Sequence, residues 1–208
     1  MSKSRVLGDP SLTPPGQYFG AACYTAYPYS RGKIHITGPD WEDAPHFETG
    51  FFTDDGDVDL KAQIWAYKRF RELMRRTTFY RGELEMRHPR FRKESQAAVV
   101  DLTEPLVTHD QSRKDLPDLV YDDEDDKAIE ECLRDNIGTT WHSLGTCKMA
   151  PREQKGVVDA SLNVYGVTGL KVIDLSIPPT NVAANTANTT YAIGEKGADI
   201  IMKELGLA

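Results

Sequence analysis

The residues with the clearest chemical potential lie between positions 141 and 190. His142 stands in the segment WHSLGTCKMA, and Gly145 follows where the backbone can turn sharply or approach a ligand closely. Imidazole titrates near neutral pH, which makes histidine the most frequent general base in enzymes. An isolated histidine of this kind is nevertheless structural more often than catalytic, so both interpretations of His142 stay open.

A second candidate group is the carboxylate of Asp174. The apolar run at residues 170–173 ends at this aspartate, and Pro178 and Pro179 then force a loop. Nucleotide-binding α/β folds place an acid at the end of a hydrophobic strand, where it accepts hydrogen bonds from sugar hydroxyls. The pattern therefore predicts a strand with a sugar-binding carboxylate at its end.

Asparagines and threonines gather at residues 181–188 (NVAANTAN), just before a helix expected over residues 189–205. The helix N-terminus would present free N–H groups and a partial positive charge, which suit an anionic ring or oxygen. The amide side chains could equally be helix caps. Gly194 and Gly197 would allow close packing, and one helix face is expected to carry Ile193, Ile200, Ile201 and Leu205.

The elements that must position these groups include a helix expected over residues 60–76. Asp59 is the expected N-cap, and the opposite, charged face is expected to lie in water. Apolar residues recur at helical spacing at Leu60, Ile64, Tyr67, Phe70 and Met74, and the charged face carries Lys61, Lys68, Arg69 and Glu72.

Three stretches upstream have strand character, at residues 17–29, 32–37 and 46–52, and suggest an antiparallel sheet. His35 is interpreted as a histidine of that sheet. The acidic run at residues 122–126 lacks the spacing of a calcium loop, so it is interpreted as the solvated N-terminus of a helix over residues 125–136.

Composition excludes several classes of function. The 208 residues carry a net charge of −7, which argues against nucleic acid as a partner. Apolar runs are too short for a membrane span, and three cysteines without CxxC spacing suggest neither disulfides nor a metal site. We expect a soluble intracellular protein, cytoplasmic or peroxisomal, although its end, Gly-Leu-Ala, is not an SKL-type address.

Several ordered motifs together resemble one family. HSLGTCKM, GVVDASLNVYGVTGLKVIDLSIPP and AANTANTTYAIGEKGADII are similar to the C-terminal signature of the glucose–methanol–choline (GMC) flavin oxidoreductases, especially their fungal and yeast alcohol (methanol) oxidase branch. The likeness extends upstream to LGDPSLTPPGQYF and YPYSRGKIHITGP. It therefore covers nearly the whole chain.

The resemblance implies a role for each candidate residue. His142 matches the catalytic histidine that acts as base while hydride passes from a short primary alcohol to flavin N5, and Asn185 matches the second member of that pair. Trp141 would help to wall a small substrate pocket. Residues implied to contact FAD are Asp174, Leu175, Thr186 and Ala187.

The resemblance also implies a fold. It is of the α+β class, with an antiparallel sheet backed by helices as a substrate-binding domain at residues 1–155. Residues 156–208 would supply the last strand and helix of an FAD-binding α/β domain.

No GxGxxG sequence is present, so the N-terminal Rossmann part is absent and the FAD site is incomplete. We expect a fragment, a split gene product or a truncated gene model that is inactive alone. Its partner would be an N-terminal FAD-binding half or a homo-oligomer. The alternative is a non-enzymatic remnant of the family that serves as a binding or interaction module.

Overall fold

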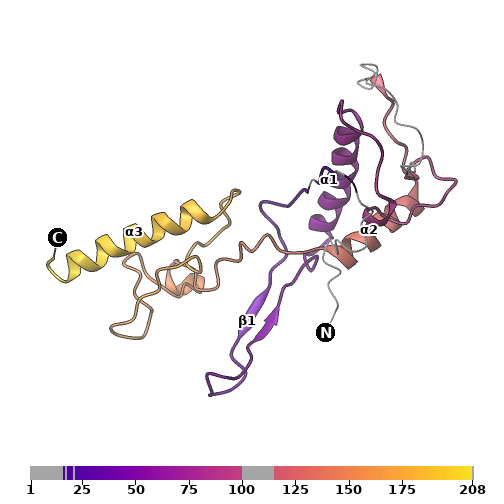
Figure 1. The fold of residues 1–208 in the computed structure, drawn as a ribbon. Helices are drawn as coiled ribbons and strands as arrows, with labels where there is room; N and C mark the ends of the chain where they lie inside the picture. The colour runs from indigo at the N-terminus through magenta and orange to yellow at the C-terminus, as the bar shows by residue number, and fades with distance from the viewer. Residues whose placement is uncertain (1–15, 17, 21, 100–114, 208) are drawn as a thin grey trace. The chain divides into compact units, whose positions relative to one another are not determined.

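The computed structural model describes residues 16, 18–20, 22–99 and 115–207. Their regular elements, in chain order, are β1 (Lys33–His35), β2 (His46–Glu48), α1 (Val58–Arg75), η2 (Glu85–Arg87), α2 (Asp123–Asn136), η4 (Arg152–Gln154) and α3 (Ala187–Glu204) (Figure 1). Helix predominates, and the expected antiparallel sheet is a two-stranded ribbon in the described part of the chain. None of the described helices is long and apolar enough to cross a membrane.

The chain divides into two compact units. Unit 1 combines the residues up to Thr25 with Phe51–Gly138, and unit 2 combines Ala26–Gly50 with the residues from Thr139 onward. This division reflects packing within the chain. The boundary expected at residue 155 concerns the domains of a whole enzyme and stays a prediction.

Helix α1 confirms the helix expected near residues 60–76, but its capping differs from the expectation. Oδ2 of Asp54 accepts from the backbone N–H of Val58 at 2.6 Å and of Asp59 at 3.4 Å. Asp59 lies inside the first turn and is buried, so its assignment as N-cap is wrong. A carboxylate four residues before the helix start satisfies the same free amides from outside.

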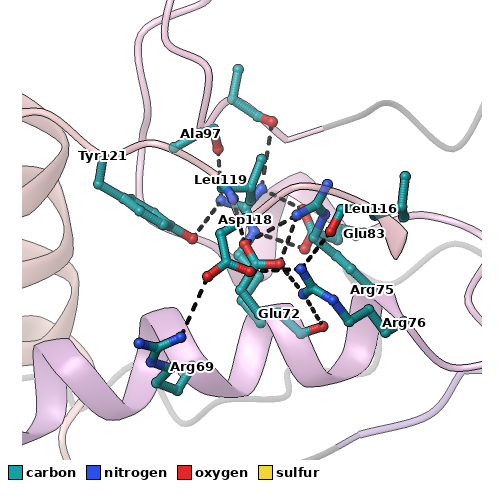
Figure 2. A network of polar contacts seen from close by, with 12 residues as sticks. Arg69, Glu72, Arg75, Arg76, Glu83, Ala97, Leu116, Asp118, Leu119 and Tyr121 are labelled. Atoms are coloured by element: carbon teal, nitrogen blue, oxygen red, sulfur yellow. Dashed lines mark hydrogen bonds and ion pairs between the residues drawn. The ribbon is translucent and has the colours of Figure 1, made fainter. Parts of the chain in front are cut away.

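The buried residues of α1 are polar except Leu60, and Arg71 among them belongs to a network of polar contacts with Glu83 (Figure 2). Arg71 donates from Nε and Nη2 to the two carboxylate oxygens of Glu83, at 2.8 and 2.6 Å, and from Nη1 to the carbonyl of Ala97 at 2.7 Å. Burial alone would lower the pKa of Arg71, but the hydrogen bonds and charge of Glu83 raise it well above its ordinary value. The guanidinium thus stays charged in the interior.

Glu72 extends this network and corrects a second expectation. Its carboxylate accepts from Arg75 Nη1 at 3.0 and 2.8 Å, from Arg76 Nη1, and from the backbone N–H of Leu119 at 2.7 Å. Glu72 was expected on the solvated face of the helix, whereas it is buried. The periodicity of apolar residues could not reveal the partners that make burial of this carboxylate tolerable.

Helix α2 confirms the interpretation of the acidic run as a helix N-terminus. Asp122 accepts from the backbone N–H groups of Glu124 and Asp125, and Asp125 accepts in return from the N–H of Asp122, which completes a capping box. The run is solvated only in part, because Asp125 is buried, against the expectation, and accepts from Ser95 Oγ at 2.8 Å. Helix α2 packs on α1, and Asp126 pairs with Lys68 across them.

Unit 2 is built around a small apolar core at Val158, Leu162 and Ile177. Ile173 and the α3 residues Ile193 and Ile200 pack against it. The segment before α3 is held by isolated β-bridges, such as Asn163 to Lys171, instead of regular strands. The strand expected at residues 170–173 is therefore present only as a single bridge.

The β1–β2 ribbon also belongs to unit 2. It confirms the strands expected near residues 32–37 and 46–52, in shortened form, whereas the described part of residues 17–29 contains no strand. Its register pairs Ile34 with Phe47 and His35 with His46, and all six strand residues are exposed. A two-stranded ribbon exposed on both faces is marginally stable by itself.

Candidate functional site

A short backbone ladder joins the segment after His142 to the segment after Asp174. The N–H groups of Gly145, Cys147 and Met149 donate to the carbonyls of Leu175, Ser176 and Ile177, at 3.3, 2.9 and 2.7 Å. This ladder begins three residues after His142 and one residue after Asp174. Two of the predicted site segments are thus fixed on one framework within unit 2.

Gly145 makes this ladder possible. Its φ is +82°, and a Cβ atom at this position would lie 3.1 Å from the carbonyl oxygen of Pro178. An L side chain would be strained by the dihedral angle and crowded by that oxygen. The positive φ confirms the sharp turn predicted at Gly145, whereas the alternative of a close approach to a ligand stays a prediction.

His142 is partly buried and makes no hydrogen bond or ion pair with any other residue that the structure describes. Its imidazole is therefore available to a ligand. Trp141 has a φ of +58° and donates its backbone N–H to Thr139 Oγ1 at 2.9 Å. Its side chain is 86% exposed, so the pocket wall predicted for Trp141 stays a prediction.

Asp174 lies at the surface and organises the turn that follows it. Its Oδ1 accepts from the N–H of Ser176 at 2.7 Å, and its carbonyl accepts from the N–H of Ile177 at 3.2 Å. Its other carboxylate oxygen has no hydrogen-bond partner among the described residues. Asp174 can therefore accept from a sugar hydroxyl without losing its structural bond.

The start of α3 holds the remaining predicted residues. Thr186 is the N-cap residue and only 5% exposed, and its carbonyl accepts from both the N–H and Oγ1 of Thr190, at 2.9 and 3.0 Å. Asn185 Oδ1 accepts from the N–H of Ala187 at 3.0 Å, so Asn185 does cap the helix locally. The first turn contains no acidic residue, which leaves the positive end of the helix dipole uncompensated.

No hydrogen bond or ion pair within the described ranges joins His142 or Asp174 to Asn185 or Thr186. The predicted catalytic pair is thus in one unit, but its two members are not hydrogen-bonded to each other. Sequence reasoning did not anticipate Ser176, whose backbone serves both the turn and the ladder and whose Oγ is buried without a partner. The Asp-x-Ser spacing typical of a side-chain-capped turn was the available signal.

These groups are the ones that the sequence analysis predicts to form one wall of a flavin site. They comprise a surface carboxylate, a helix N-terminus without acidic neighbours and a backbone ladder with a close-approach glycine. Asp174, Asn185 and Ala187 are exposed, so this wall is open. A pocket of about 570 Å³ in the same unit is lined by Met149, Ala150, Pro151, Arg152, Glu153, Val158, Asp159, Ala160 and Tyr165, and by none of the predicted site residues.

Residues 28–194 match the family described as GMC oxidoreductase, and the chain belongs to this family. Alcohol oxidase 1 of Komagataella phaffii is 40% identical, with 96% of this chain and 36% of that protein covered. The alcohol oxidase of Pichia angusta is 38% identical, with 98% and 36% covered. The chain thus spans about a third of the length of these relatives, at their C-terminal end.

Solved structures agree with this assignment. An FAD-dependent oxidoreductase from Chaetomium thermophilum superposes with a TM-score of 0.61 at 26% identity, with 88% of this chain and 26% of that chain covered. A variant of formate oxidase from Aspergillus oryzae gives a TM-score of 0.57 at 25% identity, with 83% and 25% covered. The described units therefore form part of a GMC fold.

Proposed function

We propose that this chain is the catalytic-histidine portion of an FAD-dependent oxidoreductase that converts a short primary alcohol to its aldehyde. The observation that carries the proposal is the ladder linking the His142 segment to the Asp174 turn, in a chain 40% identical to an alcohol oxidase. FAD, when bound, accepts the hydride that leaves the alcohol carbon. The alcohol loses its hydroxyl proton at the same time, and the protein must receive that proton.

The residues of this chain divide the remaining tasks. An imidazole nitrogen of His142 takes the hydroxyl proton, because the ring has no competing partner among the described residues. Asn185 carries an amide NH₂ that orients the substrate oxygen, since its carbonyl oxygen is already bonded to Ala187. Trp141, exposed here, covers the substrate once the site is closed.

The same chain supplies one wall of the cofactor site. Asp174 holds a sugar hydroxyl with its available carboxylate oxygen, and Leu175 presents the adjoining backbone. Thr186 and Ala187 stand at the positive end of α3, which would stabilise negative charge on the bound cofactor. The pyrophosphate cradle must come from an FAD-binding part, because this sequence holds no GxGxxG.

The test is to produce the chain together with the N-terminal two-thirds of Komagataella phaffii alcohol oxidase 1 and to isolate the two parts as a complex. The proposal expects a yellow complex whose flavin absorbance is bleached by methanol or ethanol without oxygen. The chain produced by itself is the control and should stay colourless.

A complex that retains FAD but is not bleached by any short primary alcohol would contradict the proposed reaction. It would favour instead a binding or interaction module that keeps the fold of the family.

A further inference from the structure

A single hydrogen bond holds the chain directly before His142. The backbone N–H of Trp141 donates to Thr139 Oγ1 at 2.9 Å, and within the described part of the chain residues 139–144 make no other hydrogen bond or ion pair. The next hydrogen bond along the chain belongs to the backbone ladder, which begins at Gly145. The imidazole of His142 is therefore positioned from two sides, by the ladder after it and by the Thr139 hydroxyl before it.

The backbone of Trp141 needs this support. Its φ of +58° lies in the left-handed region, which an L residue with a bulky side chain adopts only at a steric cost. The indole is 86% exposed, so packing of the ring does little to offset that cost. A hydrogen bond contributes free energy of the same order as left-handed strain. The hydroxyl of Thr139 is thus the described group that stabilises this conformation.

Loss of the Thr139 hydroxyl would let the chain turn differently just before His142. Relaxation of Trp141 to an ordinary negative φ changes the direction of the chain at the residue that carries the imidazole. Within the described ranges, residues 142–144 make no hydrogen bond that would resist such a shift. A general base must lie within hydrogen-bond reach of the proton it takes, so a displacement of about 1 Å affects the chemistry even when the fold is intact.

We propose that Thr139 is a positioning residue for His142. Its Oγ1 holds the left-handed turn at Trp141, and this turn sets where the imidazole stands relative to the hydroxyl of the substrate. The inference rests on the proposed function, in which His142 takes the hydroxyl proton of the alcohol. Thr139 touches neither substrate nor cofactor in this account and acts only through the backbone that follows it.

Two adjacent threonines provide matched variants for the test. Thr139→Val removes the hydroxyl and keeps the branched shape, whereas Thr139→Ser keeps the hydroxyl. Thr140→Val makes the same chemical change one residue later, at an exposed side chain without a hydrogen-bond partner among the described residues. Both positions are exposed, so all three variants should fold, which circular dichroism and urea denaturation verify.

The first measurement follows the turn itself, in the isolated chain and without cofactor. Exchange of the Trp141 amide proton with water, measured by NMR on ¹⁵N-labelled protein, should be about fivefold faster in Thr139→Val, because its acceptor is gone. Thr139→Ser and Thr140→Val should exchange this proton at the wild-type rate. Equal exchange in all four chains would show that the Thr139 hydroxyl does not hold the turn and would overturn the inference.

The second measurement follows the chemistry. Each chain is produced together with the N-terminal two-thirds of Komagataella phaffii alcohol oxidase 1, and anaerobic flavin reduction by ethanol is recorded by stopped-flow absorbance per bound flavin. Thr139→Val should lower the limiting rate about fivefold or more, with an unchanged apparent Kd for ethanol and unchanged FAD content. Thr139→Ser and Thr140→Val should match the wild-type rate. A Thr139→Val chain that loses FAD or recovery but keeps its rate per flavin would reduce Thr139 to a structural role and overturn the inference.

His142→Ala separates the inference from the proposed function. If Thr139 acts through His142, adding Thr139→Val to His142→Ala should cause no further loss of rate. A further fivefold loss in the double variant would overturn the inference and leave His142 as the base. A wild-type rate in His142→Ala would instead refute the role of His142 in the proposed function, and the inference with it.

Discussion

At the scale of single residues, the structure separates groups that are engaged from groups that are available. Asn185 and Asp174 each accept a hydrogen bond from a nearby backbone N–H with one side-chain oxygen. His142 has no partner among the described residues. The imidazole of His142 forms no hydrogen bond or ion pair in the described part of the chain, so it is available to a ligand.

Replacement of His142 should therefore affect chemistry and leave stability unchanged. In the complex with the FAD-binding part, His142→Ala should slow anaerobic flavin reduction by about 10² or more, the usual range for loss of a general base. Stopped-flow absorbance measures this rate. His35→Ala, at an exposed histidine of β1, is the control and should reduce the flavin at the wild-type rate. Unchanged reduction in His142→Ala would remove this residue from the mechanism.

Glu83 represents the opposite case, a charged residue whose role is structural. Glu83→Gln should lower the free energy of unfolding by about 3–5 kcal/mol, because it leaves the buried guanidinium of Arg71 without its counter-charge. Urea denaturation followed by helical circular dichroism measures the change. Glu130→Gln removes an exposed partner of Arg134 and should cost less than about 0.5 kcal/mol. Similar losses in the two variants would contradict this account.

At the scale of elements, periodicity predicted which segments are helices but not which faces are buried. The stripe expected to bury α1 did include Leu60, yet the deepest residues also include Arg71 and Glu72. Their burial depends on Glu83 and Leu119, which lie 12 and 47 residues away along the chain. Local sequence does not encode such distant partners, so propensity arguments assign these charges to water.

In the candidate site too, local features could be predicted from the sequence and contacts between distant segments could not. The turn at Gly145 was predicted correctly because a positive φ is a local property that favours glycine. The ladder to Leu175 pairs segments 30 residues apart and could not be read from spacing alone. The sequence analysis placed Ile200 and Ile201 on one face of α3, but Ile200 packs against the core and Ile201 is exposed. Adjacent residues point about 100° apart on a helix, so these two cannot share a narrow face.

The two glycines of α3 should respond in opposite ways to the same substitution. Gly194→Ala should stabilise the chain by about 0.5–1 kcal/mol, because alanine favours the helix and the site is open. Gly197→Ala should destabilise it by about 1–3 kcal/mol, because the added methyl group collides with Ile173. Urea denaturation of the two variants measures both effects. Stabilisation by Gly197→Ala would show that the packing of α3 on the core is looser than described.

The packing of α1 should also make stability depend on pH. Burial lowers the pKa of His88, helped by the charge of Arg71 and opposed by that of Glu83, and its Nδ1 lies 2.8 Å from the hydroxyl of Tyr67. Below the ordinary value of 6.5 the unfolded chain therefore binds a proton that the folded chain still excludes. Stability should fall as pH decreases below 6.5 and level off once the folded histidine is also protonated.

His88→Asn isolates this contribution, because its amide oxygen replaces the acceptor and does not titrate. The difference in unfolding free energy between wild type and His88→Asn, measured between pH 5 and 8, should change with pH in the direction described. If this difference is constant across the range, His88 is not the source of the pH dependence of stability.

At the scale of the whole molecule, two elements of unit 2 expose apolar side chains. The β1–β2 ribbon exposes Ile34 and Phe47 on one face, and α3 exposes Tyr191 and Leu205. Contiguous exposed apolar surface of this kind marks interaction sites. The wall of the proposed flavin site is exposed as well, so cofactor binding and assembly should depend on each other.

FAD alone should consequently have no effect on the thermal unfolding of the isolated chain. A ligand stabilises a protein by RT ln(1 + [L]/Kd), which amounts to about 2.7 kcal/mol when its concentration is 100 times Kd. Asp174 and the start of α3 offer only an open wall without a pyrophosphate cradle, so Kd should far exceed any practical FAD concentration. In the complex with the FAD-binding part, the same addition should raise the unfolding temperature by several degrees. Differential scanning calorimetry with and without FAD makes the comparison, and a saturable increase in the isolated chain would show that this chain holds the cofactor unaided.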